Sequence, residues 1–165
     1  MRRHAVFLNG PVGVGKTTLG RSLATAPDVA FIDGDDFSDP DRPWYASSLR
    51  TSHAIIDAIR SSLDSHRLAV VAYPVRCVNW IFYRRRLARA GVDTSFIGLV
   101  GSYEQIVAVG RGRRFSADER TRIKEMIGQG YGRQPFNDLI VDAGSEPLEP
   151  TVRRLTLELV RRLSL

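Results

Sequence analysis

One short segment limits what this chain can fold into more than any other feature of its sequence. Residues 10–17 read Gly-Pro-Val-Gly-Val-Gly-Lys-Thr and match the pattern G-x-x-x-x-G-K-[ST] at every defined position. Residues 5–8 before it are apolar, and residues 18–24 after it have the pattern of a helix. Glycines let backbone N–H groups turn inward around a phosphate, and a helix N-terminus adds partial positive charge there. The segment therefore predicts a phosphate-binding P-loop between a buried strand and a helix.

The P-loop pattern assigns a task to particular side chains. Lys16 is expected to reach the β- and γ-phosphates of a nucleoside triphosphate, and the Thr17 hydroxyl can bind Mg²⁺. Only Lys16 and Lys124 are lysines among 24 basic residues, so the position of Lys16 is informative. A dinucleotide site is disfavoured because its third glycine would have to stand at Thr18. The residues of this loop expected to bind the nucleotide are Gly10, Pro11, Val12, Gly13, Val14, Gly15, Lys16, Thr17 and Thr18.

The rest of the chain alternates short apolar runs with amphipathic stretches. Most of the runs lack clean period-two alternation, which is typical of strands covered on both faces. The expected strands are 4–9, 29–33, 68–73, 95–100 and 138–142. The expected helices are 16–25, 47–66, 78–90, 102–109, 117–128 and 149–163, with a capping box at Ser116 and Glu119. This alternation predicts an α/β fold with a parallel sheet between helices, in one domain over residues 1–165.

Three carboxylates follow the second expected strand. The sequence reads Asp33-Gly34-Asp35-Asp36, and the carboxyl ends of strands in such sheets face the crevice where ligands bind. Beside a P-loop, one carboxylate can hold Mg²⁺ and another can take the proton from an attacking hydroxyl. The alternative is an acidic turn made of good turn-forming residues.

The P-loop followed by a strand that ends in Asp-Gly-Asp-Asp resembles the small P-loop metabolite kinases. These include gluconate kinase, shikimate kinase and adenylylsulfate kinase, with chloramphenicol phosphotransferase more distant. The resemblance implies a P-loop NTPase three-layer sandwich, a five-stranded parallel sheet in the order 2-3-1-4-5, and the cofactors ATP and Mg²⁺. It also implies that Asp33 lies near the metal, that Asp35 is the catalytic base, and that Asp35 and Asp36 contact the acceptor.

The same resemblance places an arginine-bearing lid at about residues 111–120, where the sequence begins Arg-Gly-Arg-Arg. A lid arginine stabilises charge on the transferring phosphoryl group and excludes water. Arg113 and Arg114 are the catalytic candidates, Arg111 is a candidate for nucleotide binding, and Arg120 is a further possibility. Sequence spacing does not choose among them.

Two more arginines fall where the related kinases bind their acceptor. Arg76 follows the third expected strand, and Arg133 precedes the fifth. Residues 143–147 resemble the loop on the adenine side. Other positions depart from the family, because residues 69–73 contain no aspartate and no Gly-Gly-Gly follows them. We therefore expect an acceptor other than shikimate, gluconate or adenylylsulfate.

Charge and composition leave a different class of function open. A net charge of +6 and a basic stretch near residues 84–89 could attract nucleic acid, with Trp80 and Tyr83 as a stacking platform. Cys77 is the single cysteine and is expected to be a buried small apolar residue. The longest apolar runs are too short to span a bilayer, and the N-terminus lacks a signal-length apolar segment. A cytoplasmic protein is therefore expected.

Together these features predict an ATP- and Mg²⁺-dependent kinase that phosphorylates a hydroxyl of a small molecule. We expect a monomer or homodimer whose partners are a nucleoside triphosphate and a small acceptor. Three alternatives stay open: a phosphotransferase acting on an antibiotic or natural product, a protein that binds nucleic acid or modifies RNA ends, and a nucleotide-binding regulator without catalysis.

Overall fold

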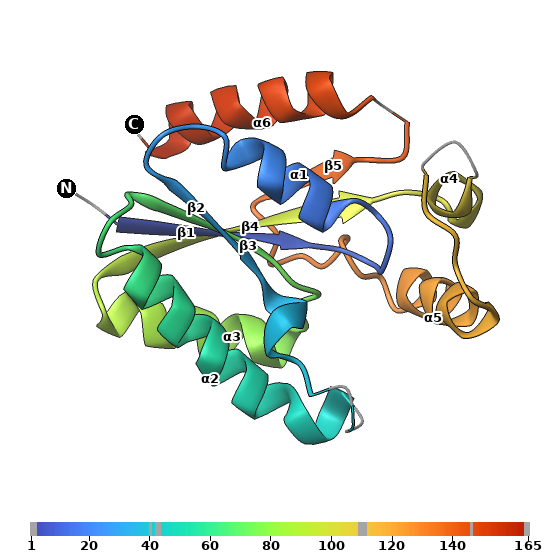
Figure 1. Ribbon diagram of the computed structural model, residues 1–165, viewed down its shortest axis with the longest axis horizontal. Coiled ribbons are helices and arrows are strands. Elements are labelled where there is room, and N and C mark those ends of the chain that lie inside the picture. Colours follow the sequence, from blue (N-terminus) through green and yellow to red (C-terminus); the bar gives the residue numbers. More distant parts are fainter. Residues whose placement is uncertain (1–2, 40, 42–43, 109–111, 146, 164–165) are drawn as a thin grey trace.

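The computed structural model describes residues 3–39, 41, 44–108, 112–145 and 147–163 (Figure 1). At 44–47 and 162–163 it describes the helical backbone but not the side chains. None of the described helices combines the length and the hydropathy that a bilayer crossing would require.

Five parallel strands form one sheet in the order β2-β3-β1-β4-β5, as expected (Figure 1). The strands are β1 (Arg3–Asn9), β2 (Val29–Asp33), β3 (Leu68–Ala72), β4 (Val92–Val100) and β5 (Leu139–Asp142). β4 begins earlier than the expected residue 95, because Val92 pairs with Arg3 at the start of β1. The central strand β1 is paired on both sides, with β3 and with β4.

Helices cover both faces of the sheet. They are α1 (Lys16–Leu23), α2 (Trp44–Ser62), α3 (Cys77–Arg89), α4 (Tyr103–Val107), α5 (Ala117–Gly128) and α6 (Leu148–Leu163), with a short 3₁₀ helix η1 (Gly34–Phe37) after β2. Figure 1 shows α1 and α6 on one face of the sheet, α2 and α3 on the other, and α4 and α5 beyond the carboxyl end of β1.

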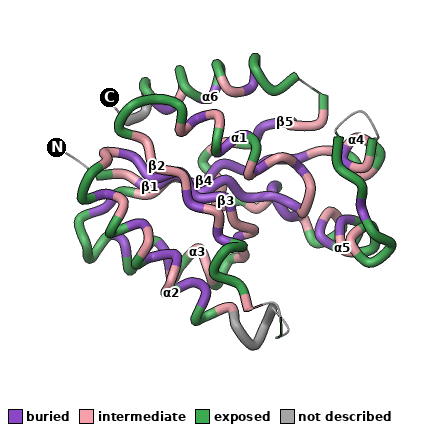
Figure 2. Tube along the Cα trace, in the orientation of Figure 1, coloured by how far each residue is buried: buried purple, intermediate pink, exposed green. Residues whose placement is uncertain are grey.

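The side chains of β1 alternate between two hydrophobic clusters, one on each face. Val6 and Leu8 belong to the cluster that includes side chains of α1 and α6, whereas Ala5 and Phe7 belong to the one that includes side chains of α2 and α3. Figure 2 shows the resulting band of buried residues along the sheet. Burial on both faces explains why these strands read as continuous apolar runs.

Near α3 the structure removes one possibility raised by the sequence, at Tyr83, and corrects one expectation, at Cys77. Tyr83 is fully buried and stacks on Phe7, with 4.6 Å between ring centroids, so it cannot serve as an exposed platform for bases. Cys77 is exposed rather than buried, because it is the first residue of α3, at the edge of the hydrophobic cluster rather than inside it. In both positions the place of the residue in the helix, and not the residue type, decides the exposure.

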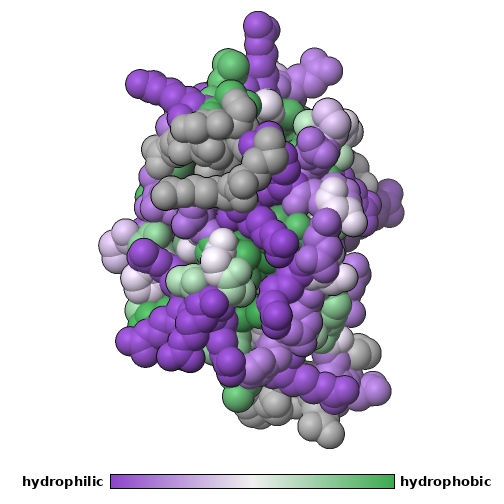
Figure 3. All heavy atoms as spheres, turned by 90° about the vertical axis from the view of Figure 1, so that its left-hand side faces the viewer, coloured by the Kyte–Doolittle hydropathy of each residue, from purple (hydrophilic) through white to green (hydrophobic). Residues whose placement is uncertain are grey.

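The end of the molecule where the strands begin has a mostly hydrophilic surface with a small apolar area (Figure 3). A hollow of about 230 Å³ lies at this end. Its apolar lining includes Leu23, Pro27, Val29 and Leu159. The P-loop and the acidic segment lie at the opposite end of the sheet, where the strands finish.

β4 and the loop before β5 approach each other backbone to backbone. A Cβ atom added to Gly98 would lie 1.9 Å from the carbonyl oxygen of Gly132. A Cβ atom on Gly132 would lie 2.2 Å from the carbonyl oxygen of Leu99, and its φ of +85° also favours glycine. Side chains are therefore excluded from both sides of this contact.

Replacing Gly98 should destabilise the protein strongly. In the Gly98→Ala variant the new methyl group meets backbone that cannot move without shifting β4, so we expect a loss of at least about 2 kcal/mol. Gly128→Ala is the matched control, because Gly128 is helical and has nothing within 4 Å of the added carbon. That variant should be neutral or gain up to about 1 kcal/mol. Urea unfolding of both variants would measure this, and equal stabilities would contradict the close backbone contact.

Candidate functional site

The P-loop connects β1 to α1 through three glycines with positive φ. Gly10, Gly13 and Gly15 have φ values of 154°, 77° and 112°. A Cβ atom on Gly10 would also lie 2.5 Å from the carbonyl oxygen of Leu99. Only glycine adopts such angles without strain, so the loop can turn tightly before α1 begins at Lys16.

Lys16 is a buried cation at the start of α1. Only 8 % of the residue is exposed, and its Nζ donates hydrogen bonds to the carbonyl oxygens of Gly10 at 3.0 Å and Pro11 at 2.8 Å. Burial lowers the pKa of Lys16 to about 8, while the charges of Asp35 and Asp33 act in the opposite direction. The loop thus holds an ammonium group that a phosphate would stabilise.

Thr17 and Asp33 lie in direct contact. The Thr17 hydroxyl donates to Asp33 Oδ2 at 3.0 Å. Asp33 ends β2 and caps η1, with its Oδ1 accepting from the Asp35 N–H at 3.2 Å. It stands beside Ala72, the last residue of β3. A carboxylate therefore reaches the P-loop from β2, although β3 ends without an aspartate.

Asp35 faces the same space as Lys16, whereas Asp36 does not line it. Partial removal from water raises the pKa of Asp35, and the nearby Lys16 ammonium opposes that rise. Asp36 is exposed and raises the pKa of Asp35 further through its negative charge. Tyr73 is packed against Gly34, and burial raises its pKa with an added contribution from Asp35.

A cleft of about 500 Å³ opens at the carboxyl edge of the sheet. The P-loop, the start of α1 and Asp35 form one part of its wall, and residues after β5 form another. Its lining residues are Val12, Gly13, Val14, Gly15, Lys16, Thr17, Thr18, Leu19, Asp35, Ala72, Pro74, Arg113, Ala143, Pro147, Leu148 and Thr151. The cleft therefore collects the predicted P-loop residues from Val12 onward, one acidic residue and one arginine of the expected lid.

The structure distinguishes among the arginines of the expected lid, which sequence spacing did not. Both Arg113 and Arg114 are exposed, but only Arg113 lines the cleft. Arg120 donates through Nε to the carbonyl oxygen of Phe115 at 3.3 Å and is likewise absent from the lining. Arg111 lies outside the described residues.

Phe115 is a residue of this region that sequence reasoning missed. Its ring lies over Gly13 so closely that a Cβ atom there would be 2.6 Å from Phe115. Phe115 belongs to the same hydrophobic cluster as Leu8 and Leu19. The sequence did offer one indication, since Phe115 is a single aromatic residue in a polar stretch. Its contact Gly13, however, is about a hundred residues away in sequence.

Arg76 and Arg133 lie in loops near each other but outside the lining of the cleft. Arg76 precedes α3, donates through Nε to the Tyr131 hydroxyl, and donates through Nη2 to Gln129 Oε1 at 3.3 Å. Its guanidinium also lies 5.6 Å from the Tyr131 ring centroid. Arg133 is exposed. Their predicted contact with an acceptor stays a prediction.

A buried polar network holds these loops beside the P-loop, and its centre is Asn9. The Asn9 side chain is fully buried, accepts from the Val75 N–H at 2.7 Å, and donates to Gln134 Oε1 at 2.9 Å. Gln134 Oε1 also accepts from the Gly132 N–H at 2.9 Å. The sequence signal was a single polar residue at the end of an apolar strand, immediately before Gly10.

Removing the centre of this network should destabilise the fold. Asn9→Ala leaves the Val75 N–H without its acceptor in a buried place, which should cost about 1–3 kcal/mol in thermal or urea unfolding. Gln134→Ala should cost less. Because the two side chains share hydrogen bonds, the double variant should lose less than the sum of the single losses. Strictly additive losses would contradict a shared network.

The structure is an α/β sandwich with a P-loop between β1 and α1. No protein-family model matches the sequence, and neither does any curated protein. The solved structures that it resembles share its fold over nearly their whole length. A gluconokinase from Sinorhizobium meliloti is 20% identical with a TM-score of 0.68, covering 97% of this chain and 93% of that one.

Two further structures extend the comparison. The Deinococcus radiodurans tunicamycin resistance protein is 14% identical with a TM-score of 0.70, and 96% of each chain is covered. The shikimate kinase from Aquifex aeolicus is 16% identical with a TM-score of 0.53, covering 96% of this chain and 98% of that one. The fold expected from the resemblance to small P-loop kinases is thereby confirmed.

Proposed function

We propose that this protein is an ATP- and Mg²⁺-dependent kinase that transfers the γ-phosphoryl group to a hydroxyl of a small molecule. The observation that carries the proposal is the placement of Lys16 and Asp35 in one cleft, where each alters the pKa of the other. A phosphate-binding cation and a carboxylate able to accept a proton are what transfer to a hydroxyl needs.

The nucleotide would bind along the P-loop. Backbone N–H groups of residues 12–18 would surround the phosphates, and Lys16 would exchange its bonds to loop carbonyls for bonds to phosphate oxygens. The loop from Ala143 to Pro147 would contact the adenine, since both residues line the far side of the cleft. Arg111 is retained in this proposal as a nucleotide-binding candidate from sequence alone.

The residues present suit a magnesium ion held together with phosphates. Thr17 and Asp33 offer a hydroxyl and a carboxylate oxygen in contact with each other. Among the described residues, no three or more His, Cys, Asp or Glu side chains are grouped as a metal site. Mg²⁺ commonly takes one or two carboxylates and completes its shell with phosphates and water. When bound, it would neutralise phosphate charge.

Asp35 would orient the acceptor hydroxyl and take its proton. Its raised pKa makes it a better base than an ordinary carboxylate. Arg113 would stabilise negative charge on the transferring phosphoryl group, and it is better placed for this than Arg114 because it lines the cleft. Asp36, Arg76 and Arg133 are proposed to contact the acceptor.

A natural-product or antibiotic acceptor is the second candidate. It is supported by the fold shared with the tunicamycin resistance protein, and by Phe37, which is 37% exposed two residues beyond Asp35. Nucleic acid is less well supported. Trp80 packs on Phe136 with ring centroids 5.4 Å apart. Tyr83, the other residue of the possible stacking platform, is buried.

The direct test is ATP consumption against a panel of sugar acids, polyols, nucleosides, antibiotics and RNA ends. Lys16→Ala should abolish transfer to whichever acceptor responds, while circular dichroism shows an intact fold. The control is Lys124→Ala, the only other lysine, which is exposed on α5 and should keep wild-type turnover. Wild-type turnover by the Lys16→Ala variant would contradict the proposal.

Asp35→Asn should lower kcat by about 10²- to 10⁴-fold, because the proton acceptor is removed. The base works only when deprotonated, and its pKa is raised. The wild-type kcat/KM should therefore fall as the pH decreases through a pKa above the usual carboxyl range. This fall of kcat/KM at low pH should be absent from the Asp35→Asn variant. It should remain in Asp57→Asn, a control on the exposed side of α2. A fall that survives in Asp35→Asn would remove Asp35 as the base.

Nucleotide affinity should weaken as the pH rises past about 8. Lys16 in the nucleotide-free protein loses its proton with a pKa of about 8, so binding above that pH must first restore the charge. Calorimetric titration in buffers of different ionisation enthalpy should detect this proton uptake. In the Lys16→Ala variant the uptake should disappear. Equal uptake in both proteins would place the titrating group elsewhere.

A further inference from the structure

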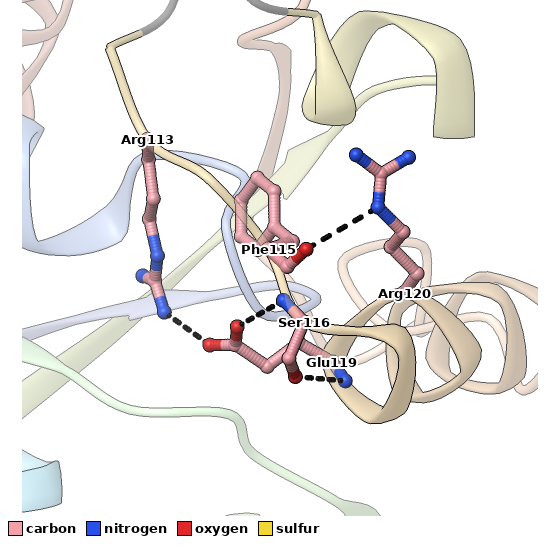
Figure 4. Close-up of polar contacts among 5 residues, drawn as sticks. All are labelled: Arg113, Phe115, Ser116, Glu119 and Arg120. Carbon is pink, nitrogen blue, oxygen red and sulfur yellow. Dashed lines mark hydrogen bonds and ion pairs between the residues drawn. The ribbon is translucent and has the colours of Figure 1, made fainter.

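Arg113 is held at the cleft by two contacts of different kind (Figure 4). Its Nη2 donates to Glu119 Oε1 at 2.8 Å, which fixes one edge of the guanidinium. Its Cζ lies 4.9 Å from the Phe115 ring centroid, which supports the flat face. A guanidinium is a rigid planar fork, so an edge contact and a face contact together restrict both its position and its tilt.

Both supports of Arg113 are themselves anchored. The Phe115 ring is packed onto Gly13 of the P-loop. Glu119 belongs to the capping box of α5, where its Oε2 accepts from the Ser116 N–H at 2.9 Å and its own N–H donates to Ser116 Oγ at 3.2 Å (Figure 4). The arginine is therefore fixed relative to the P-loop on one side and to a helix N-terminus on the other.

We propose that Glu119 is a positioning residue, which holds the Arg113 guanidinium at the cleft so that its other N–H groups can meet the phosphoryl group. The inference rests on the proposed function and adds a residue to it. Hydrogen bonds from the Ser116 backbone and from Arg113 lower the pKa of Glu119, which keeps it charged. The charge of Arg113 in turn acts on both Lys16 and Asp35.

A purely structural role for Glu119 predicts something different. The Arg113 and Glu119 side chains are 56% and 38% exposed, and exposed ion pairs contribute little to stability. Glu119→Gln preserves an oxygen that can accept from the Ser116 N–H, so helix α5 should keep its cap. If Glu119 acts through Arg113, the variant should lose catalysis while its unfolding temperature stays unchanged.

The test is a double-mutant cycle with Glu119→Gln, Arg113→Met and both together, measured with saturating ATP and the acceptor found in the panel. We expect Glu119→Gln to lower kcat by about 10- to 100-fold with little change in KM for ATP, since misplacing a catalytic group costs rate. In the Arg113→Met background it should have no further effect. Glu125→Gln is the matched control, because Glu125 lies on the same helix and pairs at 3.3 Å with Arg122, which does not line the cleft.

Two results would overturn the inference while leaving the kinase proposal intact. One is a kcat loss in the double variant equal to the product of the two single losses, and the other is an unchanged kcat in Glu119→Gln. If the wild type transfers phosphate to no acceptor, the proposed function fails by itself. In that case calorimetry would measure the affinities for ATP and ADP in the wild type and the three variants, and the ratio of the two affinities would be compared among them. Glu119→Gln should reduce this ratio only when Arg113 is present, and an unchanged ratio would overturn the positioning role.

Discussion

Parallel pairing of β1 with both β3 and β4 is the constraint on which the rest of this structure depends. It buries β1 on both faces and delivers the end of the strand, with Asn9 and Gly10, to the centre of the carboxyl edge. From there the P-loop turns into α1, and the polar network of Asn9 reaches the neighbouring loops. The P-loop and the loops that Asn9 contacts are thus positioned relative to this one strand.

The site concentrates charge that water would normally solvate. Lys16 is almost fully buried, and carbonyl oxygens supply only part of what its hydration shell would offer. Its lowered pKa and the raised pKa of Asp35 have the same origin, which is removal from water. A site of this kind is energetically incomplete without an anion. A phosphate bound beside Lys16 would correct part of that imbalance.

Much of this could be predicted from local sequence patterns, and the rest could not, for physical reasons. The P-loop, the capping box at Ser116 and the sheet order depend on short motifs or on a recurring topology. Phe115 on Gly13 and the network of Asn9 depend on contacts between distant segments. The burial expected of Cys77 was wrong because residue type alone does not fix where a side chain lies on a helix, and Cys77 is the first residue of α3. The choice of Arg113 needed its three-dimensional position.

The backbone contact between Gly98 and Gly132 sets how far the loop before β5 stands from the sheet. The Asn137 side chain, which donates to the Gly132 carbonyl oxygen at 3.1 Å, supports the same contact. The loop therefore has a fixed base and a variable outer surface. Substitutions at outward positions such as Arg133 alter what the loop presents without altering where it stands. A scaffold built in this way can change the surface of this loop while the P-loop end of the sheet remains as it was.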